Sequence, residues 1–76
     1  MSVSEEQQEV LESIQEGMSD LNSIEIQTGF KKEQIKRVLR ELEKEGFVEL
    51  KIKKDEYYLE EFWESSLTEK GKKEVV

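Results

Sequence analysis

The side chains best suited to chemistry are the basic and amide groups between residues 31 and 54. Lysine and arginine can hold phosphates, arginine can also pair with guanine, and glutamine can pair with adenine. Six of the twelve Lys and Arg residues lie between Gly29 and Val48. The candidates for contact with nucleic acid are Lys31, Lys32, Gln34, Lys36, Arg37, Arg40, Lys53 and Lys54.

The sign of the charge separates this basic band, residues 31–54, from the rest of the chain. The band holds nine bases and five acids, a local charge of +4, whereas the whole protein carries −7. Residues 1–30 hold seven acids and no Lys or Arg, and residues 55–76 hold seven acids and three lysines. Because a polyanion is repelled by the acidic remainder, contact with nucleic acid is expected at the band alone.

The composition excludes several classes of function. The chain has no cysteine and no histidine, which removes disulfides, thiolate or imidazole metal sites and the usual nucleophile–base pairs. We therefore expect no enzyme, no cofactor and no metal. Nothing resembles a signal peptide or a membrane span, so we expect no membrane contact and a cytoplasmic location. A length of 76 residues fits one domain, 1–76, with a small core.

Two helices are predicted before the basic band. Ser4 followed by Gln7 is a capping box that begins the first helix, and Gly17 is a natural stop. Ser19 or Asp20 can cap the second, shorter helix. The apolar residues recur at helical spacing, with Val10, Leu11, Ile14 and Met18 in the first helix and Leu21, Ile24 and Thr28 in the second.

A third helix is predicted from about Lys32 to Glu45. The pair Gly29-Phe30 precedes it and the pair Gly46-Phe47 ends it, and each glycine suits the left-handed residue of a helix stop. Its apolar face consists of Ile35, Val38, Leu39 and Leu42. With that face inward, Glu33, Arg37, Arg40 and Lys44 point outward, and Gln34 and Lys36 lie on the flanks.

The outward residues of this helix have two interpretations. They can contact DNA, or they can form an ordinary solvated face. Lys36 and Arg40 are a like-charge pair four residues apart, which stability of the helix alone does not favour. We therefore prefer contact with DNA.

Beyond Phe47 the apolar period changes from about 3.6 to about 2, which predicts a β-hairpin. Val48, Leu50 and Ile52 alternate with polar residues in the first strand, and 54–56 is a polar turn. The returning strand begins at Tyr57, and its alternation is broken at residues 60–61, where we expect a bulge or a change of face. Ser66 or Thr68 can start a short last helix.

Aromatic residues gather in the returning strand, as Tyr57, Tyr58, Phe62 and Trp63. We expect most of them in the core beneath the hairpin. An aromatic that is exposed instead favours a partner surface. Ile26 is a second candidate for such a surface, because the inward positions of its helix are already occupied.

The order of these elements is similar to that of a winged helix-turn-helix domain, an α+β fold. The segment from Ile35 to Glu49 resembles the recognition helix and first wing strand of MarR-, ArsR- and PadR-type regulators. Its pattern L-x-x-L-E-x-x-G-h-V, from Leu39 to Val48, is similar to that of the winged-helix superfamily as a whole. The segment LTEKG, 67–71, resembles the LTxxG segment of MarR-like proteins. The resemblance covers residues 18–73. It implies three helices, a two-stranded wing and a short C-terminal helix, with the third helix in the major groove.

This resemblance implies a DNA-binding transcriptional regulator whose partner is double-stranded DNA. Because one short helix makes few contacts, we also expect a homodimer on two half-sites, formed through the first helix or the C-terminal segment. The alternative is an acidic winged-helix module for protein–protein interaction, or a complex subunit without direct DNA binding. The net charge and the acids near the wing tip favour this alternative: Asp55, Glu56, Glu60 and Glu61.

Overall fold

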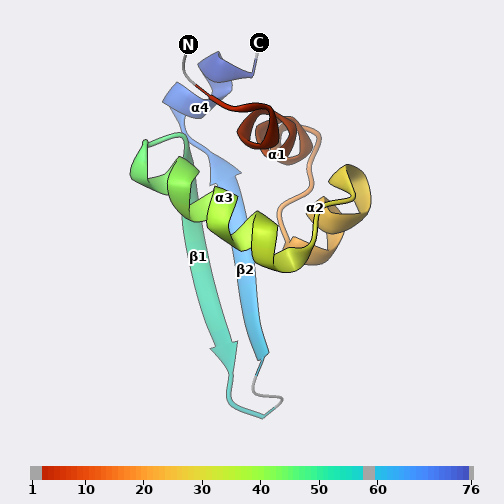
Figure 1. Cartoon of the computed structure of the whole chain (residues 1–76). Helices are drawn as coiled ribbons and strands as arrows, with labels where there is room; N and C mark the ends of the chain where they lie inside the picture. The colour runs from red at the N-terminus through yellow and green to blue at the C-terminus, as the bar shows by residue number, and fades with distance from the viewer. Residues whose placement is uncertain (1–2, 58–59, 76) are drawn as a thin grey trace.

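A computed structural model describes residues 3–57 and 60–75 of the chain, with the backbone alone for residue 60 (Figure 1). The helices and strands are α1 (Glu5–Gln15), α2 (Leu21–Thr28), α3 (Lys32–Lys44), β1 (Val48–Asp55), β2 (Glu60–Leu67) and α4 (Glu69–Glu74). Three helices, a two-stranded antiparallel hairpin and a short C-terminal helix confirm the predicted α+β, winged-helix architecture.

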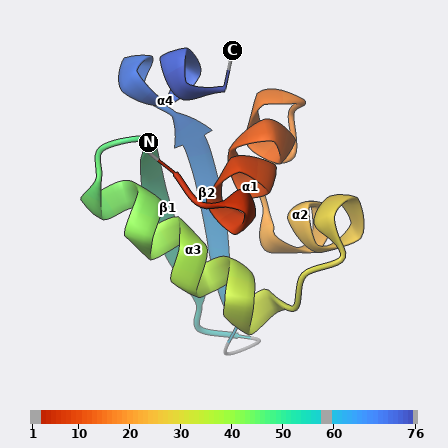
Figure 2. The ribbon, with the colours of Figure 1, turned by 45° about the horizontal axis from the view of Figure 1, so that its top comes forward.

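The three long helices surround one end of the hairpin, and the other end projects beyond α3 (Figures 1 and 2). We call β1, β2 and the turn between them the wing. The core joins α1, α2 and α3 to the base of the wing. Its buried apolar residues are Val10, Leu11, Ile14, Leu21, Ile24, Ile35, Val38, Leu39, Leu42, Phe47, Val48, Trp63 and Val75. The apolar faces predicted for the first three helices thus supply most of the core.

The helix ends follow the predicted capping chemistry. The Ser4 hydroxyl accepts a hydrogen bond from the Gln7 N–H, and the Gln7 side chain accepts one from the Ser4 N–H. Asp20, rather than Ser19, caps α2. Ser19 has another role, because its carbonyl accepts from both the N–H (2.9 Å) and the hydroxyl (3.1 Å) of buried Ser65. This contact fixes β2 to the α1–α2 connection.

The glycine stops on either side of α3 are confirmed. Gly29 and Gly46 have φ values of +79° and +83°, a left-handed conformation that residues with a β carbon rarely adopt. The Phe47 N–H then donates to the Leu42 carbonyl at 2.9 Å, which directs the chain from α3 into β1. The recognition-helix candidate is therefore fixed at both ends by its own sequence.

The expected interruption of the hairpin at residues 60–61 was wrong. The pairing runs without a gap from Val48↔Leu67 to Asp55↔Glu60, so β1 extends through the predicted turn at 54–55. Tyr57 lies in the turn, and β2 begins at Glu60. The pair of glutamates breaks the apolar alternation because this end of the wing projects into water, where neither face needs apolar side chains.

The expectation that most aromatic residues lie in the core was also wrong. Trp63 is 4% exposed and belongs to the core, but Phe62 is 51% exposed and Tyr57 is 86% exposed. Neighbouring residues of a strand point to opposite faces, so Phe62 cannot share the buried position of Trp63 beneath the helices. Tyr58 lies outside the described residues. Ile26 is exposed, as predicted.

Candidate nucleic-acid interface

Two cations of α3 lie over the indole ring of Trp63. The Arg40 guanidinium carbon is 5.1 Å from the ring centroid and the Lys36 ammonium nitrogen is 5.6 Å from it. Their spacing of four residues places both on the flank of α3 that faces β2. Trp63 is opposite Ile52 in the hairpin, on the face toward the helices. The indole therefore orients two predicted DNA-binding residues by cation–π contact, and Arg40 stays exposed.

The opposite flank of α3 faces α1, where the Glu6 carboxylate accepts hydrogen bonds from two other candidates, Arg37 and Gln34. Arg37 Nη2 lies 3.1 Å from one carboxylate oxygen of Glu6 and 3.4 Å from the other. The Gln34 side-chain amide also donates to this carboxylate. Arg37 and Gln34, two of the candidates suited to base edges, thus have an intramolecular partner.

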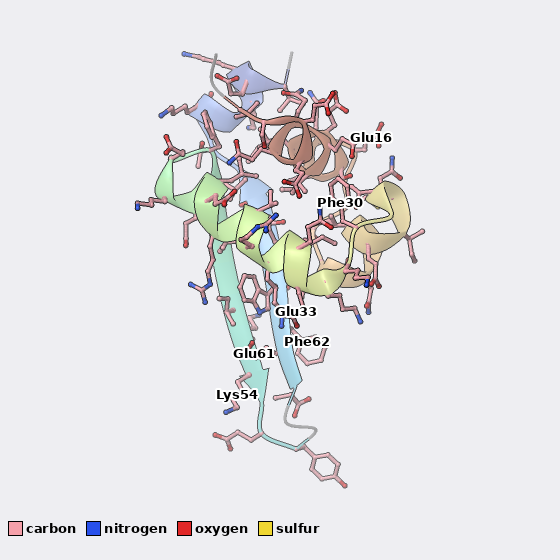
Figure 3. All side chains as sticks on the ribbon, viewed as in Figure 1. Glu16, Phe30, Glu33, Lys54, Glu61 and Phe62 are labelled. Carbon is pink, nitrogen blue, oxygen red and sulfur yellow. The ribbon has the colours of Figure 1, made fainter. Side chains whose placement is uncertain are left out.

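Two further candidates, Lys32 and Lys54, line a groove of about 640 Å³ between the helices and the wing, together with Lys36. Lys32 and Lys36 come from α3, and Lys54 comes from the projecting part of β1. Figure 3 shows Lys54, Glu61 and Phe62 along this part of the wing. The complete lining is Asp20, Leu21, Asn22, Lys32, Lys36, Lys54, Glu61, Phe62, Trp63 and Glu64. Because three acids accompany the three lysines, the groove itself has no excess of positive charge.

The last two candidates stand apart from this groove. Lys31 is the N-cap residue of α3, and its exposed side chain makes no capping hydrogen bond. Lys53 is exposed on β1 opposite Phe62, so it lies on the face of the wing that points away from the helices. The structure therefore joins Lys32, Lys36 and Lys54, and separates Lys53 from them.

Most cations of the basic band have no carboxylate partner. Among residues 3–57 and 60–75, ion pairs within 4.0 Å involve Arg37, with Glu6, and Lys72, with Glu69. Lys31, Lys32, Arg40 and Lys44 of α3 therefore present their charges to solvent. A helix face with several exposed, unpaired cations can hold phosphates.

Two residues of this site escaped the sequence prediction. Trp63 was assigned to the core without a role toward α3, although counting alternate residues along β2 would have placed it under that helix. Glu6 is 31 residues from Arg37, and no local pattern marks it as the partner among the acids of α1. Only packing of α1 against α3 brings the two together.

No protein-family model and no curated protein sequence matches the chain. Two solved structures share its fold. One is Bordetella bronchiseptica BpsR, described for regulation of its DNA binding by 6-hydroxynicotinic acid, with 15% identity and a TM-score of 0.77. The other is the MepR A103V mutant from a multidrug-resistant S. aureus clinical isolate, with 21% identity and a TM-score of 0.76. Each match covers 96% of this chain, which spans 50% of the first structure and 52% of the second.

These likenesses define the fold class: the chain has the winged helix-turn-helix fold. Within the described ranges, no helix is long and apolar enough to cross a membrane. The same residues contain no group of three or more His, Cys, Asp or Glu side chains arranged to hold a metal ion.

Proposed function

We propose that the protein is a winged-helix DNA-binding transcriptional regulator whose α3 enters the major groove. The supporting observation is that Lys31 and Lys32 at the start of α3, with Arg40 and Lys44 further along it, are exposed and have no carboxylate partner among the described residues, although the protein as a whole is acidic. Arg40, oriented on Trp63, is the central contact. BpsR, which shares the fold, is described as DNA-binding, and this agrees with the proposal.

The remaining candidates have separate roles in this proposal. Lys31 and Lys32 lie at the N-terminus of α3, where exposed amide groups and the helix dipole favour a phosphate. Lys36 and Lys54 line the protein groove between the helices and the wing, and each approaches the phosphate backbone of the DNA. Lys53 contacts phosphate only when the outer face of the wing also meets DNA. Gln34 and Arg37 pair with bases after release from Glu6.

We further propose that residues 1–76 act as one non-enzymatic DNA-binding unit in the cytoplasm, without cofactor or metal. A monomer would insert one short helix, so tight binding favours a homodimer on two half-sites. We place its interface on α1 or the C-terminal segment. The charged residues of α1 are all acids and α4 carries three lysines with two glutamates, which suit opposite-charge contact between copies.

The test is a salt titration of binding to a mixed-sequence DNA duplex, measured by fluorescence anisotropy. Lys32→Ala plus Arg40→Ala should weaken binding and lower the slope of log K against log salt by about 1.8, because two phosphate contacts are lost. Lys72→Ala plus Lys73→Ala removes the same charge from α4, and size-exclusion chromatography of each variant separates a loss of DNA contact from a loss of dimer. Absence of wild-type binding at low salt, or equal effects of both pairs with the oligomeric state unchanged, would contradict the proposal. Thermal melting checks the fold of each variant.

The second candidate function is an acidic module that binds a protein partner. The observation in its favour is the exposure of Tyr57 and Phe62 on a wing that also carries Glu56 and Glu61. Exposed aromatic residues are common anchors of protein interfaces. In this case a basic partner would remain bound to the Lys32/Arg40 variant and would be lost with Phe62→Ser. The opposite pattern would exclude this candidate.

A further inference from the structure

The carboxylate of Glu6 lies between α1 and the exposed surface of α3. Both of its oxygens lie within 3.4 Å of Arg37 Nη2, and the Gln34 amide donates to the same group. Arginine is suited to guanine and glutamine to adenine. Glu6 therefore occupies donors of two α3 residues that are suited to read bases, one arginine and one glutamine.

The position of Glu6 is fixed by the first turn of α1. The Ser4–Gln7 capping box sets the backbone on both sides of it. The Gln7 side-chain amide also donates to the Glu41 carboxylate of α3 at 3.2 Å, so a second contact ties the same turn to the same helix. The backbone of Glu6 is therefore fixed beside Arg37, so its carboxylate is not that of a residue free to move away on the surface.

The contact is nevertheless open to exchange. The side chains of Arg37 and Glu6 are 60% and 40% exposed, and ion pairs with this exposure contribute little stability. A donor of Arg37 cannot serve Glu6 and a DNA acceptor at once. The carboxylate also places a negative charge where the phosphates of a bound duplex would approach.

We propose that Glu6 is an intramolecular competitor of DNA, which holds Arg37 and Gln34 and thereby lowers the affinity of α3 for a duplex. This inference rests on the DNA binding proposed above. It assigns to α1 a direct influence on the recognition surface in addition to its role in the core.

The experiment compares Glu6→Gln with Glu9→Gln in the full chain. Glu9 lies on the same helix, is exposed, and its side chain makes no hydrogen bond or ion pair to the described part of α3. Both substitutions remove one negative charge and keep the shape of the side chain. Binding to a mixed-sequence duplex is measured over a salt series, and each variant is repeated in an Arg37→Ala background.

We expect Glu6→Gln to tighten binding about 1.5- to five-fold beyond Glu9→Gln, the range that release of an exposed ion pair allows. The salt slope should steepen by about 0.9 if the released Arg37 meets a phosphate. The excess gain should vanish in the Arg37→Ala background.

Equal effects of the two substitutions would overturn the inference while leaving DNA binding intact. Weaker binding by Glu6→Gln would also overturn it, since Glu6 would then support Arg37 in its contact with DNA. Absence of binding by the wild type and by both variants would instead overturn the proposed function, and the inference with it.

Discussion

The α carbon of Gly71 in α4 packs directly against the backbone carbonyl of Phe47 at the start of the wing. A β carbon at residue 71 would overlap the Phe47 oxygen, and would lie 3.0 Å from its carbonyl carbon and 3.3 Å from Leu67 Cδ2. The same oxygen accepts a hydrogen bond from the Thr68 N–H at 3.0 Å. The Thr68 hydroxyl donates to the Gly46 carbonyl at 2.6 Å. The start of α4 is therefore bound to the connection between α3 and β1.

Replacement of Gly71 by alanine should therefore destabilise the protein. The new methyl group meets backbone, which cannot move aside as a flexible side chain would, so we expect a loss of about 1–3 kcal/mol in unfolding free energy. Urea denaturation measures it. Lys73→Ala, an exposed change in the same helix, should stay within about 0.5 kcal/mol of wild type. An unchanged Gly71→Ala variant would disprove the close approach.

The contact between Arg40 and Trp63 should appear as a coupling energy. Arg40→Ala is compared in the wild type and in a Trp63→Leu background, and the two losses of unfolding free energy should differ by about 0.5–1 kcal/mol. Arg37→Ala provides the control because Arg37 contacts Glu6 instead. Its effect should be the same in both backgrounds. A coupling energy of zero for Arg40 would show that the indole does not orient it.

The cap of α2 should make stability depend on pH in the acidic range. A hydrogen bond with the Ser23 side chain, helped by backbone N–H groups, outweighs partial burial and lowers the pKa of Asp20 from its ordinary 3.8. A carboxyl group with a lowered native pKa stabilises the fold above pH 3.8, and this contribution is lost as the pH falls through the native value.

Asp20→Ala should accordingly cost about 1 kcal/mol at pH 7, and the difference from wild type should shrink below pH 3.8. Urea denaturation across that range measures it. Asp20→Asn keeps a capping oxygen and should lose less at pH 7. A difference between wild type and Asp20→Ala that stays constant into strong acid would rule out the titration of Asp20 as its source.

The turn before α3 tests a different property of glycine. No atom outside the turn lies within 4 Å of a β carbon built on Gly29, but its φ is +79°. Gly29→Ala should therefore cost about 1–2 kcal/mol in unfolding free energy through backbone strain alone. Gly29→Asn should cost less, because asparagine tolerates this conformation. Thermal melting of the two variants compares these losses of stability. A larger loss for Gly29→Asn than for Gly29→Ala would indicate a steric cause.

Local chemistry explains why much of the fold could be predicted. The Ser4 cap, the left-handed glycines at 29 and 46 and the apolar face of α3 act over a few residues, so their spacing in the chain determines the outcome. The helix predicted from about Lys32 to Glu45 is observed as Lys32–Lys44. Of the two predicted starts of the last helix, Ser66 and Thr68, the structure has Thr68 as the N-cap of α4, because its hydroxyl accepts from the Gly71 N–H.

The errors arose where burial depends on distant parts of the chain. The sequence of the wing does not say how far the hairpin extends past the helices, so it could not show that Phe62 and Tyr57 leave the core. The continuous register of β1 and β2 places Trp63 alone among the described wing aromatics under α3.

By itself, then, the sequence determined the helices, their ends, the hairpin and the cationic face of α3, because capping and periodicity operate between near neighbours. Only the tertiary structure decided which cations of that face are available. Because α1 and β2 lie on the two flanks of α3, Arg37 forms an ion pair with Glu6 and Arg40 forms a cation–π contact with Trp63. Those partners are 31 and 23 residues away in the chain. At such separations the tertiary fold, rather than a local pattern, determines which side chains are in contact.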